Sequence, residues 1–200
     1  MSIAERSTRS RVDSEQKLID AAAEMLGEVG PRAMSVRGIA ERAGVNHGLV
    51  HHYFGGKDGL LQAAMTQLVE QHADFVREQS HGSPIPVPLA LKEDQSYLRA
   101  VVRSVLDDEM ELVETELRAG VSVPRTALQH AITQRNMAEA DLETKARFSL
   151  GMATEMGWAA LEPFIFATMD VQGEKEKEAV RAYVRNLQYL FLQNITDSKT

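Results

Sequence analysis

Apolar and polar residues along this chain repeat at spacings of three and four, the period of an amphipathic helix, and no segment alternates as a strand would. Glycines and prolines mark most of the boundaries between the periodic segments. The pattern predicts an all-α protein. The predicted helices cover residues 14–28, 36–43, 47–53, 57–79, 95–119, 124–136, 142–169 and 174–194.

The most specific pattern is that of a helix-turn-helix. Ala40, Gly44 and Val50 stand where this motif needs a small residue at the helix crossing, a glycine in the turn and a buried aliphatic residue. Ser35 and Asn46 are suitable N-caps for its two helices. Chance apolar periodicity could place two of these three residues correctly. It is a poor explanation for all three together with N-caps at the matching positions. These residues therefore predict a helix presented to DNA.

Burying Val50 turns a polar face of the second helix outward. That face consists of His47, Gly48, Leu49, His51 and His52. A helix exposed only for solubility would more often carry Glu and Lys four residues apart. The alternative is a solvated helix whose histidines have no role, and the motif favours DNA contact.

The run IAERAGVNHGLVHHYFGGKDGLL resembles the N-terminal DNA-binding domain of the TetR (tetracycline-repressor-like) family of bacterial transcription regulators. The resemblance is specific over residues 15–65 and architectural beyond them. It implies that Arg37 and His47 reach base edges, and that Tyr53 and Lys57 hold phosphates.

Two positions depart from the family pattern, and both bear on the operator sequence. Leu49 replaces a common Thr or Ser, and His51 replaces a common Tyr. Leu49 can still contact the methyl group of thymine. The predicted DNA-contact set is Ser35, Arg37, Asn46, His47, Gly48, Leu49, His51, His52, Tyr53 and Lys57.

The net charge of −7 argues at first against a DNA-binding chain. Residues 1–58, however, carry eight basic and eight acidic side chains, and residues 59–200 hold the whole excess of acid. Arg6, Arg9 and Arg11 make the N-terminus basic. This stretch is predicted to be either an arm that orders on DNA or a terminus without a role.

Other kinds of site have little support in the sequence. There is no cysteine, no phosphate-binding loop and no nucleophile elbow, so we expect neither a cofactor nor catalysis. His47 and His51 have the spacing of two zinc ligands, but a third ligand is missing and DNA contact explains them better. An apolar leader and a membrane span are also missing, which predicts a cytoplasmic protein located at the nucleoid when bound to DNA.

We predict a DNA-binding domain over residues 1–57 and a helical effector-binding and dimerisation domain over residues 58–200. Apolar stripes on the last two helices predict a homodimer, although both stripes could instead be buried within one chain. The predicted dimer contacts are Ala153, Gly157, Ala160, Phe164, Tyr183, Val184, Leu187, Leu190 and Phe191.

The resemblance also implies a small-molecule effector. Adaptable methionines and aromatic residues in mid-chain are plausible contacts for a largely apolar ligand, or else ordinary core. They are Phe75, Leu106, Met110, Phe148, Met152, Met156 and Trp158. The predicted function is a repressor that such a ligand releases from a palindromic operator; the alternatives are a helical adaptor or an enzyme without DNA binding.

Overall fold

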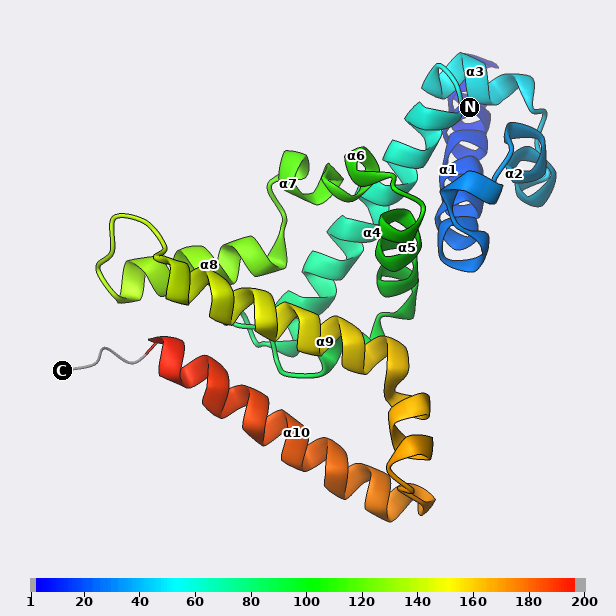
Figure 1. Ribbon diagram of the computed structural model, residues 1–200. Helices are drawn as coiled ribbons and strands as arrows, with labels where there is room; N and C mark the ends of the chain where they lie inside the picture. The colour runs from blue at the N-terminus through cyan, green and yellow to red at the C-terminus, as the bar shows by residue number, and fades with distance from the viewer. Residues whose placement is uncertain (1–2, 197–200) are drawn as a thin grey trace. The chain divides into compact units, whose positions relative to one another are not determined.

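The computed structural model describes the backbone of residues 3–196 and the side chains of residues 11–190. Over this range the chain is helical and contains no strand, which confirms the all-α prediction (Figure 1). None of the described helices combines the length and apolar character needed to cross a bilayer. The chain forms two compact units.

Unit 1 comprises the chain through His72 together with Gln95–Val121. Its elements are α1 (Ile3–Val29), the 3-10 helix η1 (Pro31–Ala33), α2 (Val36–Ala43), α3 (Gly48–Phe54), the first part of α4 (Lys57–Gln79), α5 (Gln95–Leu106), α6 (Met110–Val113) and α7 (Thr115–Ala119). The long helix α1 packs against α2, α3 and α5 (Figure 1). Leu18 and Leu26 of α1, Ile39 of α2 and Val50 of α3 are completely buried.

The turn between α2 and α3 has the predicted local chemistry. The Ser35 hydroxyl accepts a hydrogen bond from the Gly38 amide at 3.1 Å and caps α2. Gly44 ends that helix in the left-handed conformation, with φ of 66°. The Asn46 carboxamide oxygen then accepts a hydrogen bond from the Gly48 amide at 2.8 Å. The predicted helix-turn-helix is confirmed as a structural element.

The first helix begins much earlier than predicted. We expected it to start at Ser14 after a non-helical arm, but α1 already begins at Ile3. The segment lacks Gly and Pro, and its Ala, Glu and Arg residues favour helix without an apolar stripe to reveal it. Asp13, directly before the predicted start, lies within α1 and pairs with Lys17 at 2.8 Å, an exposed contact one turn along the helix.

The single helix predicted over residues 95–119 is wrong. The chain forms three helices there, because α5 ends at Leu106 and Asp108 takes a left-handed backbone conformation with φ of 62°. The carboxylate of Asp107 accepts a hydrogen bond from the backbone amide of Arg32 at 3.1 Å. This tertiary contact, in a run of like charges, interrupts a helix that the apolar spacing would have continued.

Unit 2 comprises Ala73–Asp94 and the chain from Ser122 onward. Its elements are the end of α4, the 3-10 helix η2 (Ala90–Glu93), α8 (Val123–Gln134), α9 (Leu142–Thr168) and α10 (Gly173–Thr196). Helix α10 runs back alongside α9 (Figure 1). Helix α9 bends in its C-terminal half, where Pro163 removes one backbone hydrogen bond (Figure 1).

Two glutamates of α9 join this helix to α10 and to the connector, which we define as residues 80–94. Glu155 accepts hydrogen bonds from the amides of Leu89 and Leu91, at 2.8 and 3.0 Å, and from the Gln188 side chain at 2.9 Å. Glu162, two helical turns later, pairs with the connector and α10 in the same way. The two glutamates therefore hold three segments of unit 2 together.

Glu162 is the more deeply buried of the two. Its side chain is only 5% exposed and pairs with Lys92 of η2 and with Arg181 of α10, whose Nε lies 2.8 Å away. Trp158 is a third partner and donates a hydrogen bond to Glu162 from Nε1 at 3.2 Å. Burial would raise the pKa of Glu162, but the bonds from Arg181 and Lys92 outweigh it and lower the pKa from 4.5 to about 2.

We expect Glu162→Gln to destabilise the protein by about 1.5–3 kcal/mol at neutral pH, because Arg181 and Lys92 lose a charged partner. The folded-state pKa lies below the unfolded value, so the carboxylate stabilises the fold above about pH 5 and this contribution is lost toward pH 2. Urea unfolding of both proteins should therefore show a gap in the free energy of unfolding that narrows as the pH falls.

Glu143→Gln is the matched control, because Glu143 is 65% exposed and pairs with Arg147 on the surface of the same helix. Its effect should stay below about 1 kcal/mol. Equal destabilisation by the two substitutions would contradict a special role for the buried cluster.

Candidate nucleic-acid interface

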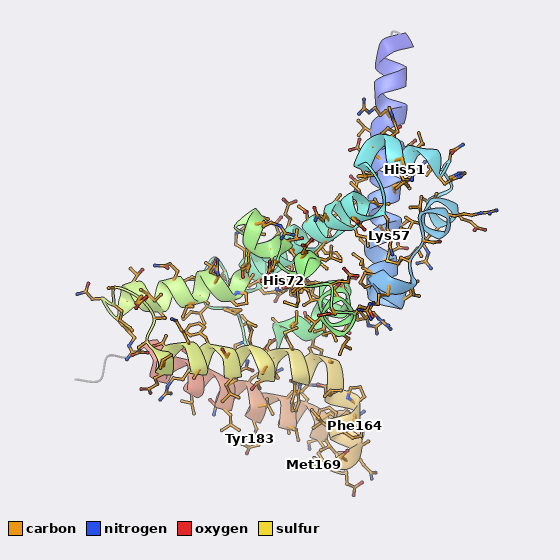
Figure 2. The ribbon with its side chains drawn as sticks, turned by 45° about the horizontal axis from the view of Figure 1, so that its top comes forward. His51, Lys57, His72, Phe164, Met169 and Tyr183 are labelled. Atoms are coloured by element: carbon orange, nitrogen blue, oxygen red, sulfur yellow. The ribbon has the colours of Figure 1, made fainter. Side chains whose placement is uncertain are left out.

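The outward face of α3 is the most exposed polar surface of the helix-turn-helix. Val50 is completely buried against the rest of unit 1, whereas His47, His51 and His52 are exposed and Leu49 is half-buried. Figure 2 shows His51 on this helix. The structure thus places these four predicted contacts on one short helix, with hydrogen-bonding imidazoles beside a single aliphatic side chain.

Helix α2 carries an exposed cation that is not paired within the described residues. Arg37 is exposed and makes no hydrogen bond or ion pair within the described part of the chain. Arg42, on the same helix, is instead committed to α1, where it pairs with Glu28 at 2.6 Å and more loosely with Glu24 at 3.7 Å. Of the two arginines on α2, only Arg37 is therefore free to contact a ligand.

Tyr53 stands at the end of α3 in an aromatic and cationic environment. Its ring lies 5.1 Å from that of His52, and the guanidinium of Arg11 sits over it at 5.4 Å. This contact brings a cation from α1 to the recognition helix. Sequence reasoning placed Arg11 in a basic terminus but missed its partner, because the early start of α1 carried no periodic signal.

Lys57 lies at the start of α4 and is half-buried (Figure 2). Its ammonium donates a hydrogen bond to the backbone carbonyl of Pro31 at 2.8 Å. An ammonium carries three donors, so two remain for a phosphate. Lys57 thus joins α4 to η1 as well as adding positive charge, and the sequence indicated only the second property.

The first turn of α4 lies very close to the end of α3. A Cβ atom added at Gly59 would collide with the backbone carbonyl oxygen of Phe54, the last residue of α3. Only glycine therefore fits at position 59 without a backbone shift. The close approach sets the position of α3 on the first turn of α4.

The other predicted contacts of this surface, Ser35, Asn46 and Gly48, are exposed at the starts of α2 and α3. Ser35 and Asn46 already accept backbone hydrogen bonds as caps. Across the described residues, no three His, Asp or Glu side chains gather in a manner that could hold a metal ion. The surface supplies hydrogen-bond donors and acceptors and one aliphatic side chain, Leu49, that could contact a thymine methyl group. These are the kinds of group that read base edges.

The predicted effector contacts are distributed over both units. Leu106 and Met110, in unit 1, are exposed at the end of α5 and the start of α6. In unit 2, Phe75, Phe148, Met156 and Trp158 are half-buried and Met152 is exposed. Trp158 packs edge-on against Phe166 at 5.8 Å and donates to Glu162. The set as a ligand site stays a prediction.

The predicted dimer contacts form an exposed apolar surface on α9 and α10. Phe164, Tyr183 and Leu187 are 68%, 73% and 65% exposed, and Figure 2 shows Phe164 and Tyr183 on these helices. Ala153, Ala160 and Leu190 are also exposed, Gly157 and Val184 are half-buried, and the side chain of Phe191 lies outside the described residues. Met169, which follows the last residue of α9, is also 65% exposed.

The N-terminal part of the chain matches a known family. Residues 18–64 match the family model described as bacterial regulatory proteins, tetR family. The chain is 37% identical over 94 residues to the HTH-type transcriptional regulator BetI 2 of Chromohalobacter salexigens, and 34% identical over 93 residues to BetI of Yersinia pestis. Each match covers 46% of this chain and 42% or 44% of the relative, so this chain spans less than half of these curated relatives.

Solved structures match almost the whole chain in fold. A transcriptional regulator from Rhodococcus sp. Rha1 superposes with a TM-score of 0.60 at 21% identity, covering 92% of this chain and 99% of that one. The fatty acid degradation regulator FadR from Bacillus halodurans gives a TM-score of 0.53 at 16% identity with the same coverage. At these identities the likeness shows the fold alone. The relatives and structures named here are described as regulators, not as enzymes.

Proposed function

We propose that this chain, whose residues 18–64 match the model of the bacterial regulatory proteins of the tetR family, is a transcription repressor of that family that binds a partly palindromic DNA operator as a homodimer. The observation that carries the proposal is helix α3, whose buried Val50 turns three exposed histidines outward, together with the exposed, unpaired Arg37 of α2. Acting on chromosomal DNA, the protein would work in the cytoplasm at the nucleoid.

In the proposed complex, α3 enters the major groove and its exposed side chains meet base edges. Arg37 would read a base, most simply guanine, through its planar guanidinium. Tyr53 and Lys57 would hold the phosphate backbone on either side of the groove. Leu49 would lie against a thymine methyl group. This division separates contacts that specify sequence from contacts that position the protein.

The apolar surface on α9 and α10 supports the homodimer. Exposed side chains such as Phe164, Tyr183 and Leu187 would be costly to leave in water on a single chain, and a second copy can cover them with the same surface. A dimer also doubles the number of base contacts. Its two α3 helices would lie roughly 34–36 Å apart, one turn of DNA, or a multiple of this distance.

The proposed effector is a small, largely apolar molecule. Trp158, Met156 and Phe148 lie on α9, and Phe75 lies on α4, which continues without a break to Lys57. A ligand that prefers one tilt of α4 would alter the separation of the two recognition helices. The ligand must bind the two arrangements with different affinity, since equal affinity shifts no equilibrium.

The first test compares Arg37→Ala with Lys57→Ala in gel shifts on a duplex from the region upstream of the chain's own gene. Arg37→Ala should cost about 1–3 kcal/mol on the specific sequence, and its thermal stability should not change. Lys57→Ala should weaken binding to all sequences alike and flatten the salt dependence. It should also lower thermal stability, because the Pro31 carbonyl loses its donor. Identical behaviour of the two variants on every sequence would refute the division of roles.

The dimer is tested by Leu187→Glu. A charge buried in the proposed interface should weaken association by at least about 2 kcal/mol, roughly 30-fold. Sedimentation should then show monomers, and operator binding should collapse. Ala182→Glu places the same charge on an exposed position of α10 away from the apolar surface and should leave the dimer intact. A Leu187→Glu protein that stays dimeric would place the interface elsewhere.

The effector is tested by a thermal-shift screen of hydrophobic metabolites and drugs, followed by gel shifts with each hit. A true effector should raise the unfolding temperature and lower operator affinity, because it stabilises an arrangement that does not fit DNA. Trp158→Ala should weaken the response to that compound. Compounds that stabilise the protein without changing operator affinity would contradict the proposed switch and leave the DNA-binding proposal standing.

A further inference from the structure

The proposed reading surface has an unusual charge composition. Residues 44–56, which form the turn and α3, contain no Lys, Arg, Asp or Glu, and their only ionisable cations are His47, His51 and His52. Imidazole changes charge between about pH 5 and pH 8, whereas Lys and Arg stay charged throughout this range. Imidazole is therefore the only side chain of this segment that can carry a positive charge.

All three histidines are exposed, and none takes part in an ion pair within the described part of the chain. The His51 ring lies near the backbone of Gly56, and the His52 ring contacts Tyr53. The charged groups at the described start of α1, on α2 and at the start of α4 are Arg11, Asp13 and Glu15, Arg37, Glu41 and Arg42, and Lys57 and Asp58; of these, Arg11 contacts the Tyr53 side chain of α3.

Several of these charged neighbours are already paired with groups other than the histidines. Asp13 binds Lys17, Arg42 binds Glu28, and Lys57 donates to Pro31. The three histidines of α3 are therefore not neutralised by these neighbours, and their charge can respond to a charged partner. In the proposed complex that charge is the phosphate backbone of DNA.

We propose that His47, His51 and His52 take up protons when α3 binds DNA, so that operator affinity rises as the pH falls and pH acts as an input separate from the effector. This inference rests on the proposed DNA-binding function and adds a form of regulation to the same site. In this proposal the protonated histidines attract the DNA phosphates, in addition to forming hydrogen bonds.

The physical reason is linkage between proton binding and DNA binding. Nearby phosphates favour the charged imidazolium over the neutral ring. Each proton taken up on binding makes the association constant rise by up to about tenfold for each unit by which the pH falls. A protonated histidine facing a phosphate also displaces a counterion, so the salt dependence of binding becomes steeper at lower pH.

Neutral histidine still offers one donor and one acceptor to a base edge. Sequence reading by α3 can therefore persist at high pH, where the charge contribution is absent. Protonation would strengthen both specific and non-specific binding, because phosphates occur at every site. The inference concerns affinity, and it leaves the choice of operator to the base contacts.

The experiment measures binding of the full chain to a fluorescent duplex from the region upstream of its own gene, by anisotropy, at constant ionic strength. Measurements at about pH 6 and about pH 8 bracket the titration of imidazole. Wild type should bind at least about tenfold more tightly at the lower pH, as expected if the three histidines together take up at least half a proton over two pH units. Its plot of affinity against salt should also be steeper there.

The triple variant His47→Gln, His51→Gln, His52→Gln keeps hydrogen-bonding groups and removes the titratable charge. It should show less than about twofold change in affinity between the two pH values, with the same salt dependence at both. The three single variants should each lose part of the pH effect, which keeps the test informative if the triple variant binds weakly. Circular dichroism checks that each variant is folded.

The matched control is the double variant His81→Asn, His130→Gln, which removes two histidines of unit 2. Asn suits the left-handed backbone of His81, whose φ is 50°. The control should keep the full pH dependence of wild type. If the triple variant keeps it as well, the α3 histidines are not its source and the inference is overturned.

Two further outcomes separate this inference from the proposed function. Wild type that binds the duplex equally well at both pH values would overturn the pH input and leave DNA binding supported. Wild type that binds no duplex at either pH would overturn the proposed function and this inference with it.

Discussion

The geometry of the reading surface depends on apolar packing against α1. Helices α2 and α3 have only eight and seven residues, too few to be stable in isolation. Ile39 and Val50 are completely buried in the same unit as Leu18 and Leu26 of α1, and this burial offsets the entropy of ordering both short helices. Because Val50 must face inward, the three histidines of α3 must face outward. The buried apolar residues therefore determine which side chains of α3 are available to contact DNA in the proposed complex.

The sequence predicted the turn well because its chemistry is local. A serine before α2, a glycine after it and an asparagine before α3 each satisfy or permit a backbone conformation within four residues, and Gly44 takes the expected left-handed conformation. The helix break after Leu106 depends instead on Asp107 binding the amide of Arg32, 75 residues away in the chain. Lys57 and Pro31 are another distant pair. Periodicity within one segment carries no information about such contacts, so these features could not be predicted.

In unit 2, too, contacts between residues distant in the sequence could not be predicted. The sequence located α9, α10 and their apolar stripes, but Glu155 and Glu162 looked like ordinary surface charges of a helix. They are seven residues apart on α9, and their partners Gln188 and Arg181 are seven apart in the opposite direction on α10. Two polar contacts spaced by two turns thus match an antiparallel pair and fix its register, because hydrogen bonds require specific geometry. The polar side of the pair faces inward, which leaves the apolar stripes exposed.

Charge in the first part of the chain is balanced, and several of its cations are already bound within the described residues. Residues 1–58 have no net charge, and within them Arg42 is paired with Glu28 while Lys57 is shared with the carbonyl of Pro31. A domain without net charge gains little from phosphates alone, so we expect its non-specific affinity for DNA to be low. In the proposed complex, Arg37 and the outward face of α3 are left to distinguish one DNA sequence from another. Weak non-specific binding raises the ratio of specific to non-specific affinity. This ratio decides how well a protein finds its site in a genome.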